Sequence, residues 1–258
     1  MARGVFAVFF PSDCRLCNAP LLNISRLPVC ETCLDAIRPI AGDTCDLCGE
    51  SVPGIAYATD LRLCGACQEM RPLFDKAVAY GPYDDELREL VHLLKYEQIL
   101  PAATMLGEML AQAIAKLDLS APVSVVPVPL HSSKRQQRGF NQATLITRAA
   151  LKQLSGKSFE LNEDVLSRVR PTVSQIGLTR PQRCENMRGA FQVVHPNKVS
   201  GRSILLLDDV LTTGTTASEC ARVLRKVGAK QVWVATVART LKNTGPQFTD
   251  VSEFEQVS

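Results

Sequence analysis

The chain has 258 residues, enough for one large domain or for two domains of unequal size. Apolar residues make up 46% and charged residues 21%, a balance that permits a sizeable core and excludes a disordered or collagen-like chain. No apolar run is long enough for a membrane-spanning helix, and the apolar stretch at 5–10 ends at Pro11 without a cleavage site. We therefore expect a cytoplasmic protein with no membrane insertion.

Cysteine is concentrated at the N-terminal end of the chain. Eight of the ten cysteines form CxxC pairs: Cys14 with Cys17, Cys30 with Cys33, Cys45 with Cys48, and Cys64 with Cys67. In a chain without a secretory signal, such pairs predict metal sites rather than disulfides. Eight thiolates and two divalent ions would bring the formal net charge from +3 to about −1. Overall charge therefore gives no argument for nucleic-acid binding.

Two CxxC turns together supply the four thiolates of a tetrahedral zinc site. Twelve residues separate Cys17 from Cys30 and fifteen separate Cys48 from Cys64, so each second turn can fold back onto the first. Four thiolates leave no position for water or substrate, so the pattern predicts two structural zinc ions in a double zinc ribbon. Rubredoxin-like iron and disulfides are the alternatives. Sequential pairing of the turns is favoured, but the spacing does not exclude a cross-braced arrangement.

A change of pattern near residue 72 predicts a domain boundary. Before it, prolines interrupt short apolar stretches; after it, strands alternate with helices, which predicts an open, mostly parallel α/β sheet. We expect the double zinc ribbon at 1–71, an α/β domain with a separate core at 72–241, and a disordered tail at 242–258.

The elements of the α/β part are predicted from apolar periodicity. Strands are expected at 76–80, 123–128, 191–194, 204–207 and 232–237, and helices at about 84–94, after Pro101, around 146–154 and at 215–227. Residues 163–190 are polar, rich in arginine and broken by two prolines, so a long mobile loop is expected there.

The run LLLDDVLTTGTT at 205–216 is the most informative part of the sequence. A buried strand ends in Asp208 and Asp209, a loop of threonine and glycine follows, and a helix begins at once. Open α/β sheets bind ligands beyond the carboxyl ends of their strands, and a helix N-terminus with free N–H groups holds phosphate. Because the two acids would repel phosphate, ribose hydroxyls or magnesium must be their partners. The run predicts a ligand with a 5′-phosphate and free 2′- and 3′-hydroxyls.

This run resembles the phosphoribosyl pyrophosphate (PRPP) motif of type I phosphoribosyltransferases. The chain from Cys14 to about Arg239 resembles the ComF family, in which a double zinc ribbon precedes such a domain. The segments VPVPL at 126–130, KRQQRGFNQA at 134–143 and RPTVSQIGLTRPQRCENMRGAFQV at 170–193 also carry the resemblance. It implies a type I phosphoribosyltransferase-like open parallel sheet. Family members are bacterial proteins linked to natural competence and the use of external DNA.

The resemblance also implies roles for individual residues. The implied catalytic residues are Asp208, Asp209, Arg138 and Arg183. The implied PRPP-binding residues are the same two acids with Thr212, Thr213, Gly214, Thr215, Thr216, Pro129, Leu130, Gln142 and Asn186. Residues 170–186 match a flexible loop that closes over bound ligand. Thr212 replaces an aspartate that can take a proton from the base in purine enzymes, which puts purine salvage in doubt.

Two classes of function are compatible with these features. The first is a magnesium-dependent phosphoribosyltransferase that uses PRPP, with an acceptor that the sequence does not identify. The second is a binding module that senses PRPP or another nucleotide-like small molecule, while the ribbons dock single-stranded DNA or a competence ATPase or helicase. The arginines would suit a nucleic-acid track, but only Phe140 and Phe191 lie near them in the sequence as stacking partners.

Overall fold

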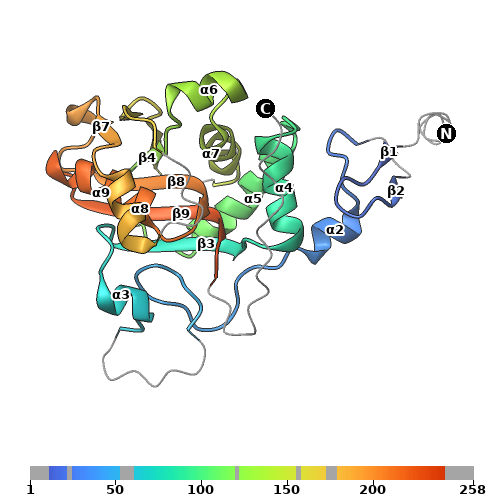
Figure 1. Cartoon of the computed structure of the whole chain (residues 1–258), viewed down its shortest axis with the longest axis horizontal. Coiled ribbons are helices and arrows are strands. Elements are labelled where there is room, and N and C mark those ends of the chain that lie inside the picture. The colour runs from blue at the N-terminus through green and yellow to red at the C-terminus, as the bar shows by residue number, and fades with distance from the viewer. Residues whose placement is uncertain are drawn as a thin grey trace.

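A five-stranded parallel sheet forms the centre of the chain (Figure 1). The computed structural model describes residues 12–21, 25–52, 61–119, 122–154, 158–172 and 179–241. The strands lie in the order β3 (Lys76–Pro82), β9 (Gln231–Arg239), β8 (Ser203–Leu211), β4 (Val123–Pro127) and β5 (Phe159–Leu161). All neighbouring pairs are parallel, which confirms the predicted fold class.

Helices cover both faces of this sheet, and the central strand β8 shows how. Leu205 and Leu207 pack with α4 (Asp85–Lys95), α5 (Ala102–Ala115) and α7 (Gln142–Gln153) on one face. Ile204 and Leu206 pack with α9 (Thr215–Lys226) on the other face. Successive side chains of a strand point to opposite faces, so a continuous apolar run is what a strand covered on both sides requires.

The arginine-rich region is more ordered than its composition suggests. β6 (Leu166–Arg168) and β7 (Phe191–Val193) pair antiparallel, and α8 (Arg180–Met187) lies between them in the chain. The expectation of one long loop at 163–190 is therefore wrong for these segments, while 173–178 lies outside the described residues. The N–H of Thr179 donates to Oε1 of Gln182 at 2.8 Å, as in a capping box, and a proline in the first turn is compatible with a helix.

Further elements of the α/β part were not predicted, among them β5. α6 (Ser132–Arg138) follows β4 and buries none of its residues, so its sequence has no apolar periodicity that could indicate a helix. A 3₁₀ turn, η1 (Pro196–Lys198), follows β7. In the described part of the chain, no helix combines the length and apolarity needed to cross a bilayer. The tail expected to be disordered at 242–258 lies outside the described residues.

The N-terminal segments lie against the α/β part at two different places (Figure 1). The first comprises β1 (Ser12–Asp13), β2 (Pro20–Leu21) and α2 (Glu31–Ala36), beside α4; the second contains α3 (Gly65–Glu69), near β3. Cys14 and Cys33 share a buried cluster with α4 and α5, and Cys45 and Cys67 share one with α9. The expectation of a separate α/β core is therefore wrong, because the buried cysteines pack directly onto it.

Candidate functional site

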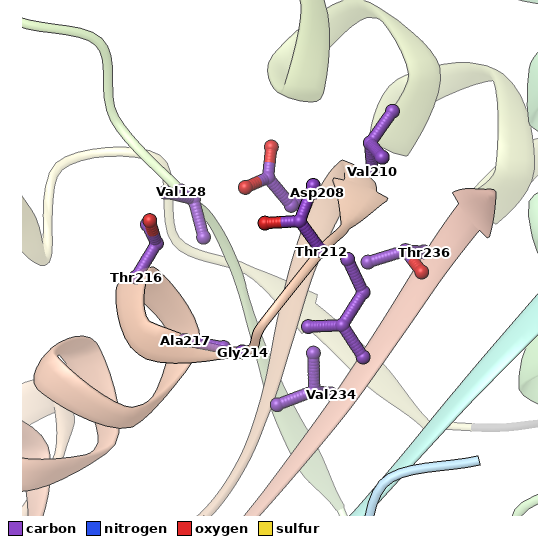
Figure 2. A pocket seen from close by; sticks show the side chains of 10 residues that line it. Val128, Asp208, Val210, Thr212, Gly214, Thr216, Ala217, Val234 and Thr236 are labelled. Atoms are coloured by element: carbon purple, nitrogen blue, oxygen red, sulfur yellow. The ribbon is translucent and has the colours of Figure 1, made fainter. Parts of the chain in front are cut away.

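The strand–loop–helix unit at β8 and α9 has the form that the sequence predicts. β8 extends to Leu211, and the loop then turns through Gly214, whose φ of 76° suits a residue without a side chain. Asp208, Thr212 and Thr216 line one small hollow of ≈ 20 Å³, and their side chains are shown in Figure 2. A carboxylate from the strand end thus lies beside the hydroxyls and N–H groups of a helix N-terminus.

The two acids of the run have different surroundings. Asp208 lines the hollow, whereas Asp209 is buried and its Oδ2 forms an ion pair with Nζ of Lys95, the last residue of α4. This follows from strand geometry, because consecutive residues face opposite sides of the sheet. The N–H of Asp209 donates to Oδ1 of Asp208 at 2.9 Å. One acid is therefore committed to an internal cation, and the other faces the loop.

The charges of this cluster depend on one another. Burial raises the pKa of Asp208 well above its usual range, and the charge of Asp209 raises it further. Burial acts in the same direction on Asp209, but the Lys95 ammonium outweighs it, so the pKa of Asp209 lies below its ordinary value. Burial opposes the charge of Lys95, yet the attraction of Asp209 raises the Lys95 pKa. The geometry therefore holds an ionised pair of Lys95 and Asp209, and it makes ionisation of Asp208 costly unless a hydrogen-bond donor reaches that carboxyl.

The segment after β4 brings two predicted site residues to the same cluster. Nη1 of Arg138 donates to Oε1 of Gln142 at 2.6 Å, and the buried Gln142 amide also hydrogen-bonds Asp209. The guanidinium of Arg138 lies 5.5 Å from the ring centre of Tyr96. Pro129 and Leu130 lie in the turn between β4 and α6. Residues far apart in the sequence thus meet at the carboxyl end of β8.

Lys134 and Arg168 bring further positive charge to the neighbourhood of this cluster. Desolvation lowers the pKa of Lys134, and the positive charges of Arg168, Arg138 and Lys95 lower it further. Burial also lowers the pKa of Arg168, although Asp208 attracts its charge, and Nε of Arg168 has no hydrogen-bond partner among the described residues. A group of partly desolvated cations with a free N–H is suited to a phosphate or pyrophosphate.

Sequence reasoning did not single out Lys95. The sequence did contain one indication of its role: Lys95 lies four residues after Val91, on the buried face of α4, where a lysine needs an acidic partner.

The structure places the predicted Arg183 and Asn186 on α8, which packs against α9. The carbonyl of Asn186 accepts from Nη2 of Arg170 at 2.8 Å. A role for Arg183 and Asn186 in ligand binding stays a prediction.

The eight paired cysteines form two groups in sequence order. Cys14, Cys17, Cys30 and Cys33 make the first group, and Cys45, Cys48, Cys64 and Cys67 make the second. Within each group, all sulfur atoms lie within 4.8 Å of one another, which supports sequential pairing of the CxxC turns. Four thiolates at this spacing fit a closed tetrahedral zinc site, and both sites are structural in character.

Comparison with known proteins supports both the zinc ribbons and the α/β part of the molecule. A double zinc ribbon domain matches residues 5–69, and a phosphoribosyl transferase domain matches residues 157–257. The chain is therefore a double zinc ribbon protein with a phosphoribosyltransferase-type domain. It is 32% identical to DNA utilization protein YhgH of Salmonella typhimurium over 235 residues, which is 90% of this chain and 98% of the relative. The chain belongs to the ComF family.

Two further relatives support that assignment. Competence protein F of Haemophilus influenzae is 30% identical over 236 residues, again 90% of this chain and 98% of the relative. Competence protein ComFC of Bacillus subtilis is 25% identical over 206 residues, 78% of this chain and 79% of that protein. The alignments with the Salmonella typhimurium and Haemophilus influenzae proteins cover almost the whole length of these two relatives. The ribbons and the α/β part therefore occur together in both.

Proposed function

We propose that this protein binds PRPP, accompanied by magnesium, and transfers its phosphoribosyl group during the use of external DNA. The observation that carries the proposal is the convergence of Asp208, the 212–216 loop and the partly desolvated cations at one end of β8. The link to external DNA comes from the relatives, which are a DNA utilization protein and two competence proteins.

Each part of the site suits one part of that ligand. N–H groups and hydroxyls at 212–216 would hold the 5′-phosphate, and Asp208 would accept a hydrogen bond from a ribose hydroxyl. Negative charge builds on pyrophosphate as it leaves the anomeric carbon. Lys134, Arg138 and Arg168 would stabilise that charge in a site with little water. Arg183 and Asn186 would join them if α8 moves when ligand binds.

A non-catalytic role is the second candidate, and Thr212 favours it. A threonine there cannot accept a proton from an incoming base, so nothing at this position assists transfer to a purine. In this alternative the site senses PRPP or a related nucleotide, and the protein acts by binding single-stranded DNA or a competence ATPase or helicase.

Calorimetry with PRPP and magnesium tests the proposal directly. We expect wild-type binding, and a loss of roughly ten- to a hundredfold for Asp208→Asn, because a charge-assisted hydrogen bond contributes about 1.5–3 kcal/mol. Asp164→Asn is the matched control, since Asp164 pairs with Lys198 at the surface. Absence of PRPP binding at millimolar ligand would contradict the proposal.

Pyrophosphate release separates the two candidates. Wild-type protein is mixed with PRPP, magnesium and a panel of bases and amines, and released pyrophosphate is measured. Release with any acceptor supports the transferase, and the acceptor is then identified from the product. Binding of PRPP without release in the whole panel supports the sensor.

A further inference from the structure

The ion pair between Lys95 and Asp209 needs an explanation other than stability. The side chains of Lys95 and Asp209 are 15% and 6% exposed, so both charges have lost most of their water. Apolar residues of similar volume are often as stable as a buried ion pair, or more so, because two charges must be desolvated to form it. Packing alone therefore does not account for a lysine and an aspartate at this position.

The location of the pair suggests what it does. The Lys95 ammonium interacts with both acids of the run, and its charge is also felt by Lys134 on α6. Its charge thus influences both the acidic and the basic residues of the site. By pairing with Asp209, it compensates one of two adjacent carboxylates, and only Asp208 faces the hollow at the loop.

We propose that Lys95 is a positioning residue of the ligand site. It holds Asp209 as an internal ion pair, which leaves Asp208 as the carboxylate that takes a ligand hydroxyl. Because its ammonium already pairs with Asp209, a divalent cation bridging both acids would have to displace it. The ligand class is a sugar phosphate with vicinal hydroxyls, bound through Asp208 without a metal ion on the acids. This inference rests on the proposed function and adds to it the identity of the group that organises the acids.

Ribose 5-phosphate is the probe for this inference, because it has no pyrophosphate to carry magnesium into the site. Its affinity is measured by calorimetry with and without magnesium chloride. We expect wild-type protein to bind it equally well in both buffers. Lys95→Met keeps the length of the side chain but removes the charge, and should weaken binding by about tenfold or more. Lys95→Arg should recover part of the loss, which a purely steric role of the side chain would not produce.

Two further variants keep the test valid if Lys95→Met folds poorly. Lys198→Met is the matched control, because Lys198 also pairs with an aspartate, Asp164, but at the surface. It should bind like wild type. The double variant Lys95→Met with Asp209→Asn removes both charges and should fold, since neither partner is left buried alone. We expect it to stay weak in binding.

The outcomes distinguish this inference from the proposed function. No binding of either ribose 5-phosphate or PRPP by wild-type protein would overturn both. Wild-type binding that requires magnesium, or wild-type affinity in folded Lys95→Met or in the double variant, would overturn the role of Lys95 alone.

Discussion

The two cysteine groups have the same sequence pattern but different surroundings. In the first group Cys17 is exposed, and the exposed Arg15, two residues before it in the chain, pairs with Glu97 at 3.8 Å. In the second group all four cysteines are buried. There, Nη2 of Arg239 donates to Sγ of Cys48 at 3.4 Å. The comparison shows that both copies of the motif contact the core, but only the second copy has all four of its cysteines buried there.

Arg239 explains why the second group belongs to the core. It ends β9, is 4% exposed, and pairs with Glu50 at 3.1 Å. Its Nε and Nη1 have no hydrogen-bond partner in the described part of the chain. Four thiolates around one divalent zinc carry a charge of about −2, which a buried guanidinium can compensate. The metal, the ribbon and the sheet therefore stabilise one another.

The largest effect should come from breaking the second group. We expect Cys48→Ser to lower the free energy of unfolding of the whole protein by about 3–5 kcal/mol, because it weakens the metal site and removes the sulfur partner of the buried Arg239, whose other partner is Glu50. Cys17→Ser should have a smaller, local effect. Thermal unfolding followed by circular dichroism checks both. If the α/β part of Cys48→Ser melted at the wild-type temperature, the shared core would be disproved.

Zinc release should separate the two groups in one experiment. A chromogenic chelator added to the zinc-loaded protein should remove the first ion at least about tenfold faster than the second, because the buried group must open to lose its metal. The rates are read from the absorbance of the chelator complex. A single phase that releases two ions per chain would show that burial makes no difference.

The role of Arg239 can be tested by itself. Arg239→Met removes the hydrogen bond to Cys48 while keeping an apolar stem, and should speed the slow phase by roughly 10–100-fold, the usual cost of losing a partner of a metal ligand. The fast phase should not change. Arg202→Met is the control, since Arg202 pairs with Glu160 at the surface. An unchanged slow phase would mean that Arg239 does not support the metal site.

The smallest effect is expected at the exposed edge of the first group. Arg15→Ala removes the ion pair with Glu97, and exposed pairs contribute no more than about 1 kcal/mol. The unfolding temperature should therefore change little. A large decrease would show that the first ribbon depends on this contact more than its exposure suggests.

Much of the fold could be predicted because it depends on local pattern. Three predicted features each combine residues that are close together in the chain: the buried run at 204–207, the loop at 212–216 and the CxxC turns. The features that the sequence analysis did not predict depend on contacts between segments that are far apart in the chain. α6 buries nothing, and the pairing of Lys95 with Asp209 becomes visible only when α4 and β8 are placed together. A single sequence can place Lys95 on the buried face of its helix, but it does not show which acid of the chain is its partner.

The pairing of β3 with β9 has a consequence for synthesis of the protein on the ribosome. β3 is the first strand of the sheet to be made, yet its partner is the last. Cys48 likewise precedes Arg239 by 191 residues. A nascent chain can assemble the cysteine turns early, but the strand that joins β3 to the sheet also brings the counter-ion of the second metal group, and it is the last to be made. Until then, β3 has an unpaired edge that a chaperone or another chain can bind.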